Sequence, residues 1–246
     1  MKTIAIIQAR TASTRLPNKI FLKLSEKPLI WHVCQRVIQS GLIDQVVLAS
    51  TNSPYDDKLV NWAKSEDIKT YRGSEENVLS RFYEAAKYFN ADVIVRITAD
   101  DPFKDPQIID KVLNVFLEKE LDFAFNNFPP TYPEGLDVEV FSFAALKQAF
   151  MNATDNFEKE HVTQYFFRNI TNFRHENISN EVDFSNFRWT IDTQEDYKMA
   201  VEVYNSLYKE GQIFCMNEIF SLLDKRPEIK NINDSIARST MYNNLN

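Results

Sequence analysis

Three cationic side chains follow directly on the first apolar segment of the chain. Residues 4–7 are apolar and lead into a loop that carries Arg10, Arg15 and Lys19, with small or hydroxylated residues between them. Arginine binds phosphate oxygens through two parallel hydrogen bonds, whereas lysine acts as a compact point charge. A solvated basic loop is the commoner alternative, but the carboxyl end of a buried strand is where an α/β sheet usually binds its ligand. The position therefore favours a polyphosphate site, and the absence of glycine from the loop excludes a P-loop.

Carboxylates follow two later apolar segments. Asp100 and Asp101 come after residues 92–98, and Asp192 comes after residues 187–191. Two carboxylates from separate strand ends, opposite a polyphosphate, can hold Mg²⁺ through their oxygen atoms while the phosphates supply further ligands. Structural roles compete with this one, because the proline after Asp101 favours a turn and Asp192 stands where a helix cap is expected. The spacing alone leaves both interpretations of the aspartates open.

A second acidic group lies between residues 133 and 141. Asp137 and Glu139 alternate with valines, so a strand would place both carboxylates on one face. A solvated strand face is the general alternative, but the neighbouring Gly135 favours a pocket wall that binds hydroxyl or amino groups of an acceptor. Glu134 would extend this acidic wall, which repels a carboxylate and accepts hydrogen bonds from hydroxyl or ammonium groups.

Two of the four glycines adjoin these motifs. Gly41 and Gly211 follow predicted helices and are typical of helix C-terminal caps. Gly73 and Gly135 adjoin predicted strands, where the absence of a side chain would let the backbone approach a ligand. The second pair is therefore assigned to the site.

Alternating apolar patterns predict the elements that position these residues. Strands are expected at residues 3–9, 45–50, 69–72, 92–98, 123–126, 136–141 and 187–191. Helices are expected to begin at Pro28, after Ser53, at Asp105-Pro106 and after the capping box of Thr193. Strands that alternate with helices indicate an α/β fold, here a three-layer α/β/α sandwich with a mostly parallel sheet.

The composition restricts the class of protein and its partners. A chain of 246 residues with a formal net charge of −7 suits one sizeable α/β domain and lacks the basic footprint of a general nucleic-acid binder. No apolar stretch reaches the ~20 residues that cross a bilayer, and Cys34 and Cys215 follow no metal-binding spacing. We therefore expect a cytoplasmic protein with neither nucleic-acid nor membrane partners. We expect one domain over residues 1–225 and a polar tail over 226–246, which is either loosely ordered or packed on a partner subunit.

Six motifs in sequence order resemble one family of enzymes. They span residues 8–19, 73–86, 98–102, 133–141, 160–163 and 188–193. Together they are similar to the signature of cytidylyltransferases that make CMP-activated sugar acids. They resemble most closely the spore coat polysaccharide biosynthesis protein F family, a relative of the CMP-KDO and CMP-sialic acid (acylneuraminate) synthetases. The resemblance runs from residue 3 to about residue 210, and it implies a GT-A-like Rossmann fold of the nucleotide-diphospho-sugar transferase type.

The resemblance also implies roles for individual residues. It implies catalytic roles for Lys19, Arg15, Asp100 and Asp192. It implies nucleotide binding by Ala9, Arg10, Arg15, Lys19, Gly73, Ser74, Ser80, Arg81 and Asp100. It implies acceptor binding by Glu134, Gly135, Asp137, Glu139, His161 and Arg188. The two aspartates of the catalytic set, Asp100 and Asp192, would bind Mg²⁺ as the cofactor, although Ala99 stands where the family commonly has glycine.

Two of these roles have specific alternatives. Arg81 and Ser74 would donate hydrogen bonds to O2 and N3 of cytosine, but Arg81 could instead pair with Glu76 or Glu84 at helical spacing. His161 would lie at the acceptor site or at a subunit interface.

The implied reaction is attack of an acceptor hydroxyl on the α-phosphorus of CTP, with release of pyrophosphate, for surface polysaccharide biosynthesis. Its partners would be CTP and a small-molecule acceptor. One alternative is a glycosyltransferase of related fold, although the chain has no Asp-x-Asp motif at Asp100. Another is a CTP-dependent enzyme that uses a non-sugar acid or a phosphonate, whereas a non-catalytic nucleotide-binding homologue is disfavoured because Lys19, Asp100 and Asp192 are all present.

The family resemblance further implies a homodimer. Aromatic residues are enriched at protein interfaces, and residues 142–170 contain more of them than one helix face needs for its own core. The aromatic residues of this stretch are Phe143, Phe150, Phe157, Tyr165, Phe166 and Phe167.

Overall fold

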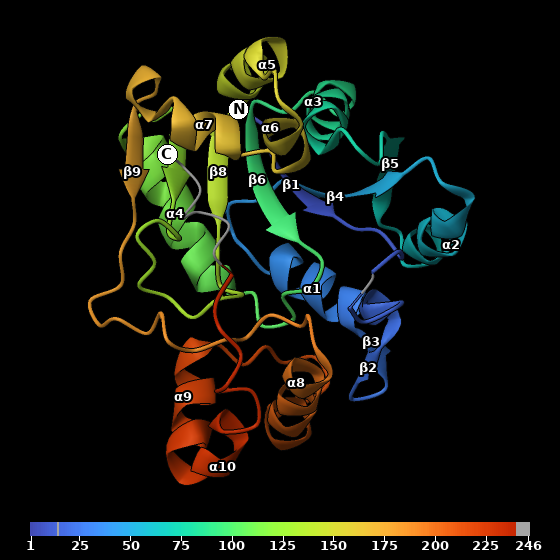
Figure 1. Cartoon of the computed structure of the whole chain (residues 1–246), viewed down its shortest axis with the longest axis vertical. Coiled ribbons are helices and arrows are strands. Elements are labelled where there is room, and N and C mark those ends of the chain that lie inside the picture. The colour runs from blue at the N-terminus through green and yellow to red at the C-terminus, as the bar shows by residue number, and fades with distance from the viewer. Residues whose placement is uncertain (14, 240–246) are drawn as a thin grey trace.

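The computed structural model describes residues 1–13 and 15–239, and a seven-stranded sheet forms its centre (Figure 1). The strands are β1 (Thr3–Gln8), β4 (Gln45–Thr51), β5 (Lys69–Gly73), β6 (Val93–Thr98), β7 (Phe123–Phe125), β8 (Glu139–Ser142) and β9 (His175–Asn177). Their order across the sheet is β5-β4-β1-β6-β8-β7-β9. Strand β8 runs antiparallel to both of its neighbours, and the other pairs are parallel. The mostly parallel sheet is therefore confirmed.

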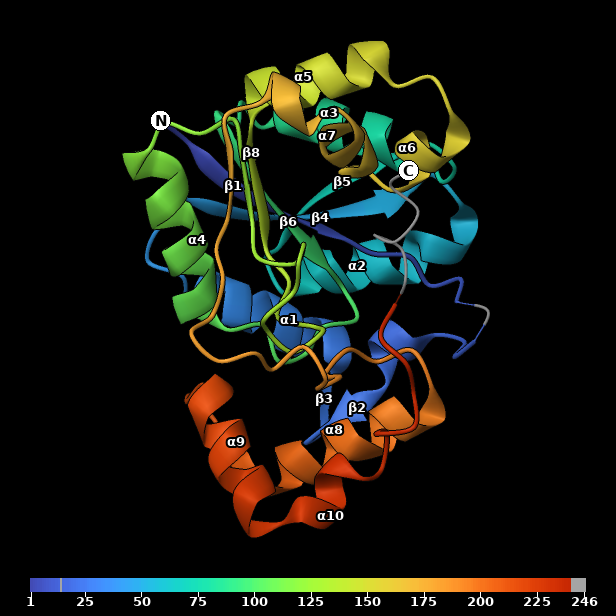
Figure 2. The same cartoon turned by 60° about the vertical axis from the view of Figure 1, so that its left-hand side comes forward.

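Helices cover both faces of this sheet (Figures 1 and 2). One face carries α1 (Leu29–Ile38), α2 (Asp57–Ser65) and α4 (Pro106–Glu118). The other carries α3 (Val78–Tyr88), α5 (Phe143–Asn152), α6 (Asn156–Glu160) and α7 (Gln164–Arg168). A further group at one end comprises α8 (Gln194–Leu207), α9 (Met216–Lys225) and α10 (Pro227–Lys230). Shorter elements are η1 (Lys19–Phe21), η2 (Pro54–Asp56), η3 (Ile170–Asn172) and the hairpin of β2 (Lys23–Leu24) and β3 (Lys27–Pro28).

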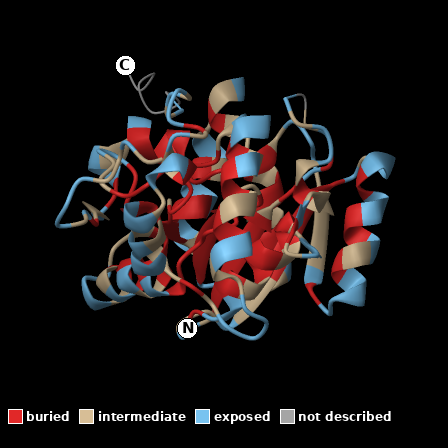
Figure 3. Ribbon diagram, turned by 90° about the horizontal axis from the view of Figure 1, so that it is seen from below, coloured by how far each residue is buried: buried red, intermediate tan, exposed pale blue. Residues whose placement is uncertain are grey.

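Alternate side chains of the strands enter two separate cores. In β1, Ala5 and Ile7 pack with α1, α2 and α4, whereas Ile4 and Ile6 pack with α3, α5 and α7. All four are fully buried, and burying an aliphatic side chain of the size of isoleucine contributes roughly 1.5–3 kcal/mol. Figure 3 shows the buried residues gathered in the sheet and on the inward sides of the helices. The three-layer α/β/α architecture is thereby confirmed. Among the described residues, no helix has the length and apolarity to cross a bilayer.

The predicted helix starts at residues 105 and 193 are those of the structure. The side chain of Asp105 accepts a hydrogen bond from the backbone N–H of Gln107 at the start of α4. Thr193 and Asp196 form a reciprocal capping box at the start of α8. By contrast, the Ser53 side chain makes no capping hydrogen bond, and η2 separates it from α2.

One predicted strand is wrong and one strand was missed. Residues 187–191 form no strand, and only Arg188 makes a single parallel bridge, to Glu134. Their apolar alternation has another cause, because Trp189 and Ile191 are buried in the core beside α8 and α9. The missed strand β9 is a polar edge strand of His-Glu-Asn sequence, defined by its pairing with β7 and not by any β-forming residue. The strand predicted at residues 136–141 begins only at Glu139.

The segment after residue 225 packs on its own chain as far as it is described. Ile229 of α10 is 1% exposed and belongs to the core shared with α8 and α9. The side-chain amide of Asn233 donates to the carbonyl of Arg188 and to the carboxylate of Asp196, both at 2.9 Å. Residues 226–239 therefore cover the domain from which they extend, and packing of the tail on a partner subunit stays a prediction.

The aromatic residues behind the homodimer prediction mostly serve the chain's own packing. Tyr165, Phe166 and Phe167 are buried in the second core. Phe150 and Phe143 stack on the ring of Tyr83 in α3, with ring centres 4.2 and 5.6 Å from it. Phe157 contacts the ring of His161. The number of aromatic residues therefore gives no argument for a subunit interface. The homodimer stays a prediction that only the family resemblance supports.

Candidate active site

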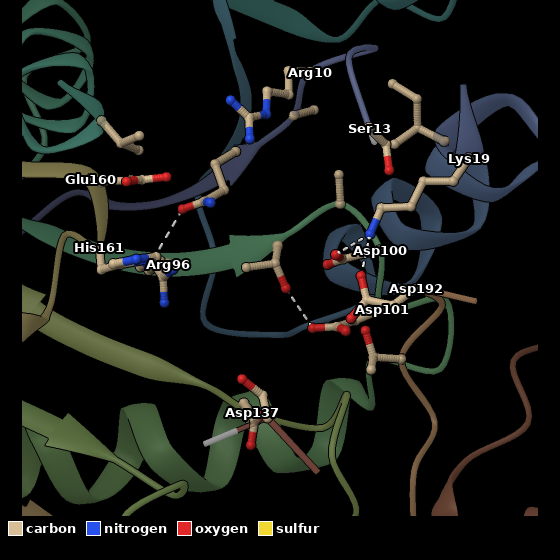
Figure 4. A pocket seen from close by; sticks show the side chains of 18 of the residues that line it. Arg10, Ser13, Lys19, Arg96, Asp100, Asp101, Asp137, Glu160, His161 and Asp192 are labelled. Carbon is tan, nitrogen blue, oxygen red and sulfur yellow. Dashed lines mark hydrogen bonds and ion pairs between the residues drawn. The ribbon is translucent and has the colours of Figure 1, made fainter. Parts of the chain in front are cut away.

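A pocket of about 450 Å³ opens at the carboxyl ends of β1 and β6 (Figure 4). From β1 the chain continues to β4 and β5 on one side of the sheet and then returns to β6 on the other side. The two strands thus flank the point at which the strand order reverses, where open α/β sheets bind ligands. The volume lies within the range of small-molecule sites. The position predicted from the cationic loop and the first aspartates is therefore that of the pocket.

Lys19 lies at the centre of the charged groups in this pocket. Its Nζ donates hydrogen bonds to Asp100 Oδ2 and Asp192 Oδ1, both at 2.7 Å, and to the carbonyl of Ile191 at 3.0 Å. Burial opposes the charge, but the two carboxylates outweigh burial and raise the pKa of Lys19 to about 12. Conversely, Lys19 outweighs the effect of burial on Asp100 and lowers the pKa of that carboxyl group. Lys19 is therefore a permanent cation and not a proton acceptor at neutral pH.

The two consecutive aspartates after β6 point in different directions (Figure 4). Asp101 accepts a hydrogen bond from Thr98 Oγ1 at 2.6 Å and forms an ion pair of 2.9 Å with Lys104. Lys104 is 1% exposed and does not line the pocket, whereas Asp101 lines it. Asp100 instead faces Lys19. Of the two aspartates, Asp100 is the one that pairs with Lys19, and its role towards a ligand stays a prediction.

Asp192 is held in the pocket by groups from several elements. Its Oδ2 accepts a hydrogen bond from Arg188 Nη2 at 2.9 Å, and Arg15 Nη2 lies 3.1 Å from its Oδ1. Its backbone N–H donates to the carboxylate of Asp196 at 3.0 Å. Since Thr193 caps α8, the side chain of Asp192 is not needed as a helix cap. The capping alternative for Asp192 is therefore wrong.

The geometry of these aspartates is compatible with a divalent cation. One carboxylate oxygen of Asp100 and one of Asp192 lie 2.7 Å from Lys19 Nζ, so both face the same region of the pocket, and a cation bound by both would lie beside the ammonium group. Among the described residues, no group of three or more His, Cys, Asp or Glu side chains forms a metal site. A metal held by two carboxylates needs its other oxygen ligands from phosphates and water, which is how Mg²⁺ commonly binds in nucleotide sites. The donor set therefore fits the predicted Mg²⁺.

The remaining cations of the first loop lie at the open side of the pocket. Arg10 and Arg15 both line it, and their side chains are 52% and 66% exposed. Arg10 makes a loose ion pair of 3.7 Å with Glu75. Such exposed pairs contribute only about 0–1 kcal/mol, so a polyphosphate can displace the carboxylate. Ala9 is buried at the start of the loop, where its N–H donates to the carbonyl of Ala49.

Arg81 of α3 forms a buried part of the pocket lining. Its side chain is 3% exposed, and its Nη1 donates to the carbonyl of Ser74 at 2.8 Å. Its Nε is buried and has no hydrogen-bond partner among the described residues. The predicted alternative, an ion pair with Glu76 or Glu84, is not formed in the described structure. Burial lowers the pKa of Arg81 to about 10, so it remains a cation with a free donor at neutral pH.

At Gly73 and Gly135, the two glycines assigned to the site, other parts of the chain occupy the space that a side chain would need. A Cβ atom on Gly73 would lie 2.9 Å from Cγ of Arg81. Gly135 has φ +104°, and a Cβ atom there would lie 2.8 Å from the backbone of Trp189 and Thr190. The structure thus gives a packing reason for both glycines, and the approach of a ligand to them stays a prediction. The close neighbours are a buried arginine and a crossing backbone segment.

The two serines assigned to the nucleotide site shape the start of α3. The Ser74 hydroxyl accepts a hydrogen bond from the N–H of Asn77, and the N–H of Ser80 donates to the Asn77 side chain. Neither serine lines the pocket, whereas Glu75 and Val78 between them do. Ser74 thus orients Arg81 through its carbonyl, and its hydroxyl is engaged within the loop.

The acidic wall on the acceptor side is a row of ion pairs. Glu134, Asp137 and Glu139 all line the pocket as predicted, and His161 lies beside them. The ion pairs join Glu134 to Arg188, Asp137 to Arg238 and Glu139 to Arg96. Each of the three carboxylates therefore has a cationic partner, although Glu134 shares Arg188 with Asp192 and Asp196, and the expected repulsion of a ligand carboxylate stays a prediction. Burial lowers the pKa of His161, which keeps its imidazole neutral at pH 7.

Arg188 is a positioning residue behind the pocket. Its side chain is 6% exposed and does not line the pocket. Its Nε faces Asp196 at 3.1 Å, its Nη1 faces Glu134 at 2.6 Å and its Nη2 faces Asp192 at 2.9 Å. With each nitrogen engaged, Arg188 orients Asp192 and is not available for a carboxylate of the acceptor. The role inferred for it from sequence is corrected accordingly.

Sequence reasoning missed several residues of the acceptor side. Arg96 interrupts the apolar sequence of β6, and this charged residue in a buried strand was a usable signal. Glu160 adjoins the assigned His161 and is exposed in the pocket lining. Arg238 and Ser239 also line the pocket, and no pattern in the polar tail pointed to them.

Comparison with known proteins identifies relatives along almost the whole chain. A family model described as Cytidylyltransferase matches residues 4–232. An uncharacterized protein of Methanocaldococcus jannaschii is 36% identical over 98% of both chains. The spore coat polysaccharide biosynthesis protein SpsF of Bacillus subtilis is 30% identical over 91% of this chain and 94% of its own. A solved cytidylyltransferase from Leptospira borgpetersenii superposes with a TM-score of 0.89 and 32% identity, over 94% of this chain and 97% of that one.

Proposed function

This chain belongs to the cytidylyltransferase family, and from this premise we propose that it transfers CMP from CTP to a hydroxyl group of a sugar acid. The observation that carries the proposal is the position of Lys19 between Asp100 and Asp192 at the strand-order switch of the sheet. A fixed cation and two convergent carboxylates there suit the phosphates of a nucleotide better than they suit an uncharged ligand.

The first loop is proposed to bind the triphosphate. Arg10 and Arg15 present exposed guanidinium groups to the β- and γ-phosphates, and Lys19 neutralises charge that develops at the α-phosphate. The acceptor oxygen forms a bond to the α-phosphorus while the bond to the bridging oxygen breaks, and pyrophosphate leaves with that oxygen. The hydroxyl proton passes to solvent. Such a displacement requires positioning and charge neutralisation more than covalent catalysis.

A divalent cation is proposed to act in the same place. Asp100 and Asp192 would hold Mg²⁺, which would supply Lewis-acid polarisation of the phosphate when it is bound. Arg188 and Arg15 keep Asp192 directed into the pocket, and the carbonyl of Asp100 accepts a hydrogen bond from the N–H of Ile191 at 2.9 Å. These contacts hold the segment before α8 against the end of β6, so the two carboxylates lie close together before any ligand arrives.

The acceptor is proposed to be a sugar acid of a surface polysaccharide. The name of the B. subtilis relative refers to spore coat polysaccharide biosynthesis, and this chain aligns with nearly all of that protein. The acceptor half of the pocket combines paired carboxylates with arginines and a neutral imidazole, which suits a ligand that carries hydroxyl groups and one anionic group.

A pyrophosphate-release assay tests the proposal. The protein is incubated with Mg²⁺, each of CTP, UTP, ATP and GTP, and a panel of sugar acids, non-sugar acids and phosphonates. We expect pyrophosphate and a CMP-acceptor adduct in equal amounts, with CTP preferred and a sugar acid as acceptor. A parallel incubation with nucleotide-sugar donors tests the alternative. Release of a nucleoside diphosphate from such a donor, without pyrophosphate from any of the four triphosphates, would indicate a glycosyltransferase and would refute the proposal.

Replacement of either aspartate by asparagine should raise the Mg²⁺ requirement. In Asp100→Asn and Asp192→Asn a neutral amide replaces a carboxylate, and an amide is a poorer ligand for a hard cation. We expect the Mg²⁺ concentration for half-maximal rate to rise roughly tenfold in each variant, as measured by titration at saturating CTP. Asp122→Asn is the control, because Asp122 pairs with Arg174 far along the surface. A wild-type Mg²⁺ titration for Asp192→Asn would leave Asp192 with a structural role alone.

A further inference from the structure

The C-terminal segment 233–239 forms one wall of the acceptor side. It rises from α10 towards the sheet, as the red trace in Figure 2 shows, and its Arg238 and Ser239 line the pocket. The match to the family model ends at residue 232. This wall therefore lies beyond the residues that match the family model, whereas the loop of Lys19 and the two aspartates lies within the match.

Contacts to the positioning residues hold this segment in place. Ser239 donates its backbone N–H to Glu134 Oε1 at 3.1 Å, and the carbonyl of Ala237 accepts from Arg188 Nη1 at 3.4 Å. Asn233 anchors the start of the segment on the carbonyl of Arg188 and on Asp196. The segment is thus joined to the same arginine that orients Asp192.

The Nη1 atom of Arg238 is held by backbone carbonyls, whereas its Nη2 atom faces a side chain that another anion could replace. Its Nη1 donates to the carbonyls of Tyr132 at 3.0 Å and Ser185 at 3.4 Å. Its Nη2 faces Asp137 Oδ1 at 3.0 Å. Backbone carbonyls cannot move away independently, so they define the position of the guanidinium group, whereas the Asp137 side chain can rotate.

Exposure separates this ion pair from the other two on the acceptor side. The side chains of Arg238 and Asp137 are 21% and 26% exposed, whereas the partners in the Arg188–Glu134 and Arg96–Glu139 pairs are all below 10%. Breaking a buried pair leaves an uncompensated charge in the interior, which is costly. A partly exposed pair contributes little and leaves its charges hydrated when it opens. Arg238 is therefore the acceptor-side arginine that can change its anionic partner.

We propose that Arg238 is a specificity-determining residue, whose guanidinium group exchanges the carboxylate of Asp137 for the carboxylate of an acid acceptor. Arginine suits this role because its planar fork binds a carboxylate through two hydrogen bonds. The inference rests on the proposed function in so far as the acceptor is an acid. It also assigns the anion-binding role that the engaged Arg188 cannot fill.

The test compares kinetics and direct binding in matched variants. The acid probe is 3-deoxy-manno-octulosonate, followed by further 2-keto sugar acids, with CTP and Mg²⁺ at saturation. Arg238→Ala should raise KM for the acid at least tenfold and leave KM for CTP within twofold, and Arg238→Lys should lie between. Arg226→Ala is the control, since this exposed tail arginine pairs with Glu202 and Glu228 outside the pocket. Asp137→Asn should lower KM for the acid several-fold, because it removes the competing carboxylate.

Calorimetry of the same acids in the presence of CMP provides a readout that needs no turnover. Weaker binding of the acid to Arg238→Ala than to wild type supports the role of Arg238 even if no pyrophosphate forms, in which case the proposed function alone fails. Pyrophosphate release with an uncharged acceptor and an unaffected Arg238→Ala would keep the proposed function and overturn the role of Arg238. Equal binding to wild type and Arg238→Ala, no binding of any acid to wild type, or a raised KM in Asp137→Asn would also overturn it.

Discussion

Lys19→Ala should abolish most of the turnover and leave the fold intact. The ammonium group lies 2.7 Å from both Asp100 and Asp192, and we propose that it neutralises charge at the α-phosphate. By analogy with loss of one oxyanion donor, its removal should cost about 2–4 kcal/mol of transition-state stabilisation, or roughly 30- to 1,000-fold in kcat/KM. The measurement is pyrophosphate release at varied CTP, together with thermal unfolding of both proteins.

Two further variants test whether a positive charge is needed at position 19 itself or whether the loss of any lysine lowers the rate. Lys23→Ala removes an exposed lysine whose partner Glu26 is also exposed, and it should retain wild-type kinetics. Lys19→Arg keeps the charge and should recover part of the rate. The pKa of Lys19 near 12 means that the effect should be constant across pH 6–9, because the group stays protonated throughout that range. Turnover of Lys19→Ala within a few-fold of wild type would remove Lys19 from the catalytic set.

The proximity of Lys19 and Asp100 could be predicted from the direction of the chain in the sheet. In a parallel sheet, the residues that follow the strands meet at one edge, so Lys19 after β1 and Asp100 after β6 had to be neighbours. Asp192 arrives at the same edge even though residues 187–191 form no strand. Its placement depends on burial of Trp189 and Ile191, whose apolar pattern was seen correctly and assigned to the wrong element.

The pairing of charges could not be predicted, because it depends on contacts between distant segments. Nothing in the sequence around Glu134 or Asp137 indicates that Arg188 and Arg238 neutralise them. The local sequence around a carboxylate is the same whether the carboxylate is unpaired or is paired with a cation that lies 50 or 100 residues away in the chain. The same holds for Gly73, where the required absence of a side chain reflects the position of Arg81 and no local turn.

For Arg81, one part of its role could be predicted from the sequence and another part could not. Its place in a family motif was visible in the sequence, whereas its burial and its unpartnered Nε emerge only from the packing of α3 against the loop of residues 73–77. A buried N–H without a partner costs free energy that a bound ligand can recover. Arg81 also lines the pocket, and recognition of the base by its guanidinium group stays a prediction that two variants can test.

Arg81→Ala should relax the choice between CTP and UTP. Cytosine presents an acceptor at N3 where uracil carries a hydrogen, so a guanidinium N–H directed at this edge favours cytosine. Because the pKa of Arg81 is about 10, the group stays a donor at neutral pH and cannot reverse its polarity to suit uracil. Loss of this contact in a desolvated pocket should lower the CTP-over-UTP discrimination by roughly 1–3 kcal/mol, measured as the ratio of kcat/KM values.

The matched control for this prediction is Arg81→Met, which removes the donors and keeps most of the side-chain volume. If hydrogen bonding determines the nucleotide, Arg81→Met and Arg81→Ala should lose discrimination to the same extent. If Arg81 only fills space beside Gly73, Arg81→Met should discriminate as well as wild type. Unchanged discrimination in both variants would exclude Arg81 from base recognition. An equal loss for CTP and UTP in both would instead indicate a contact to the ribose or phosphates, which the two nucleotides share.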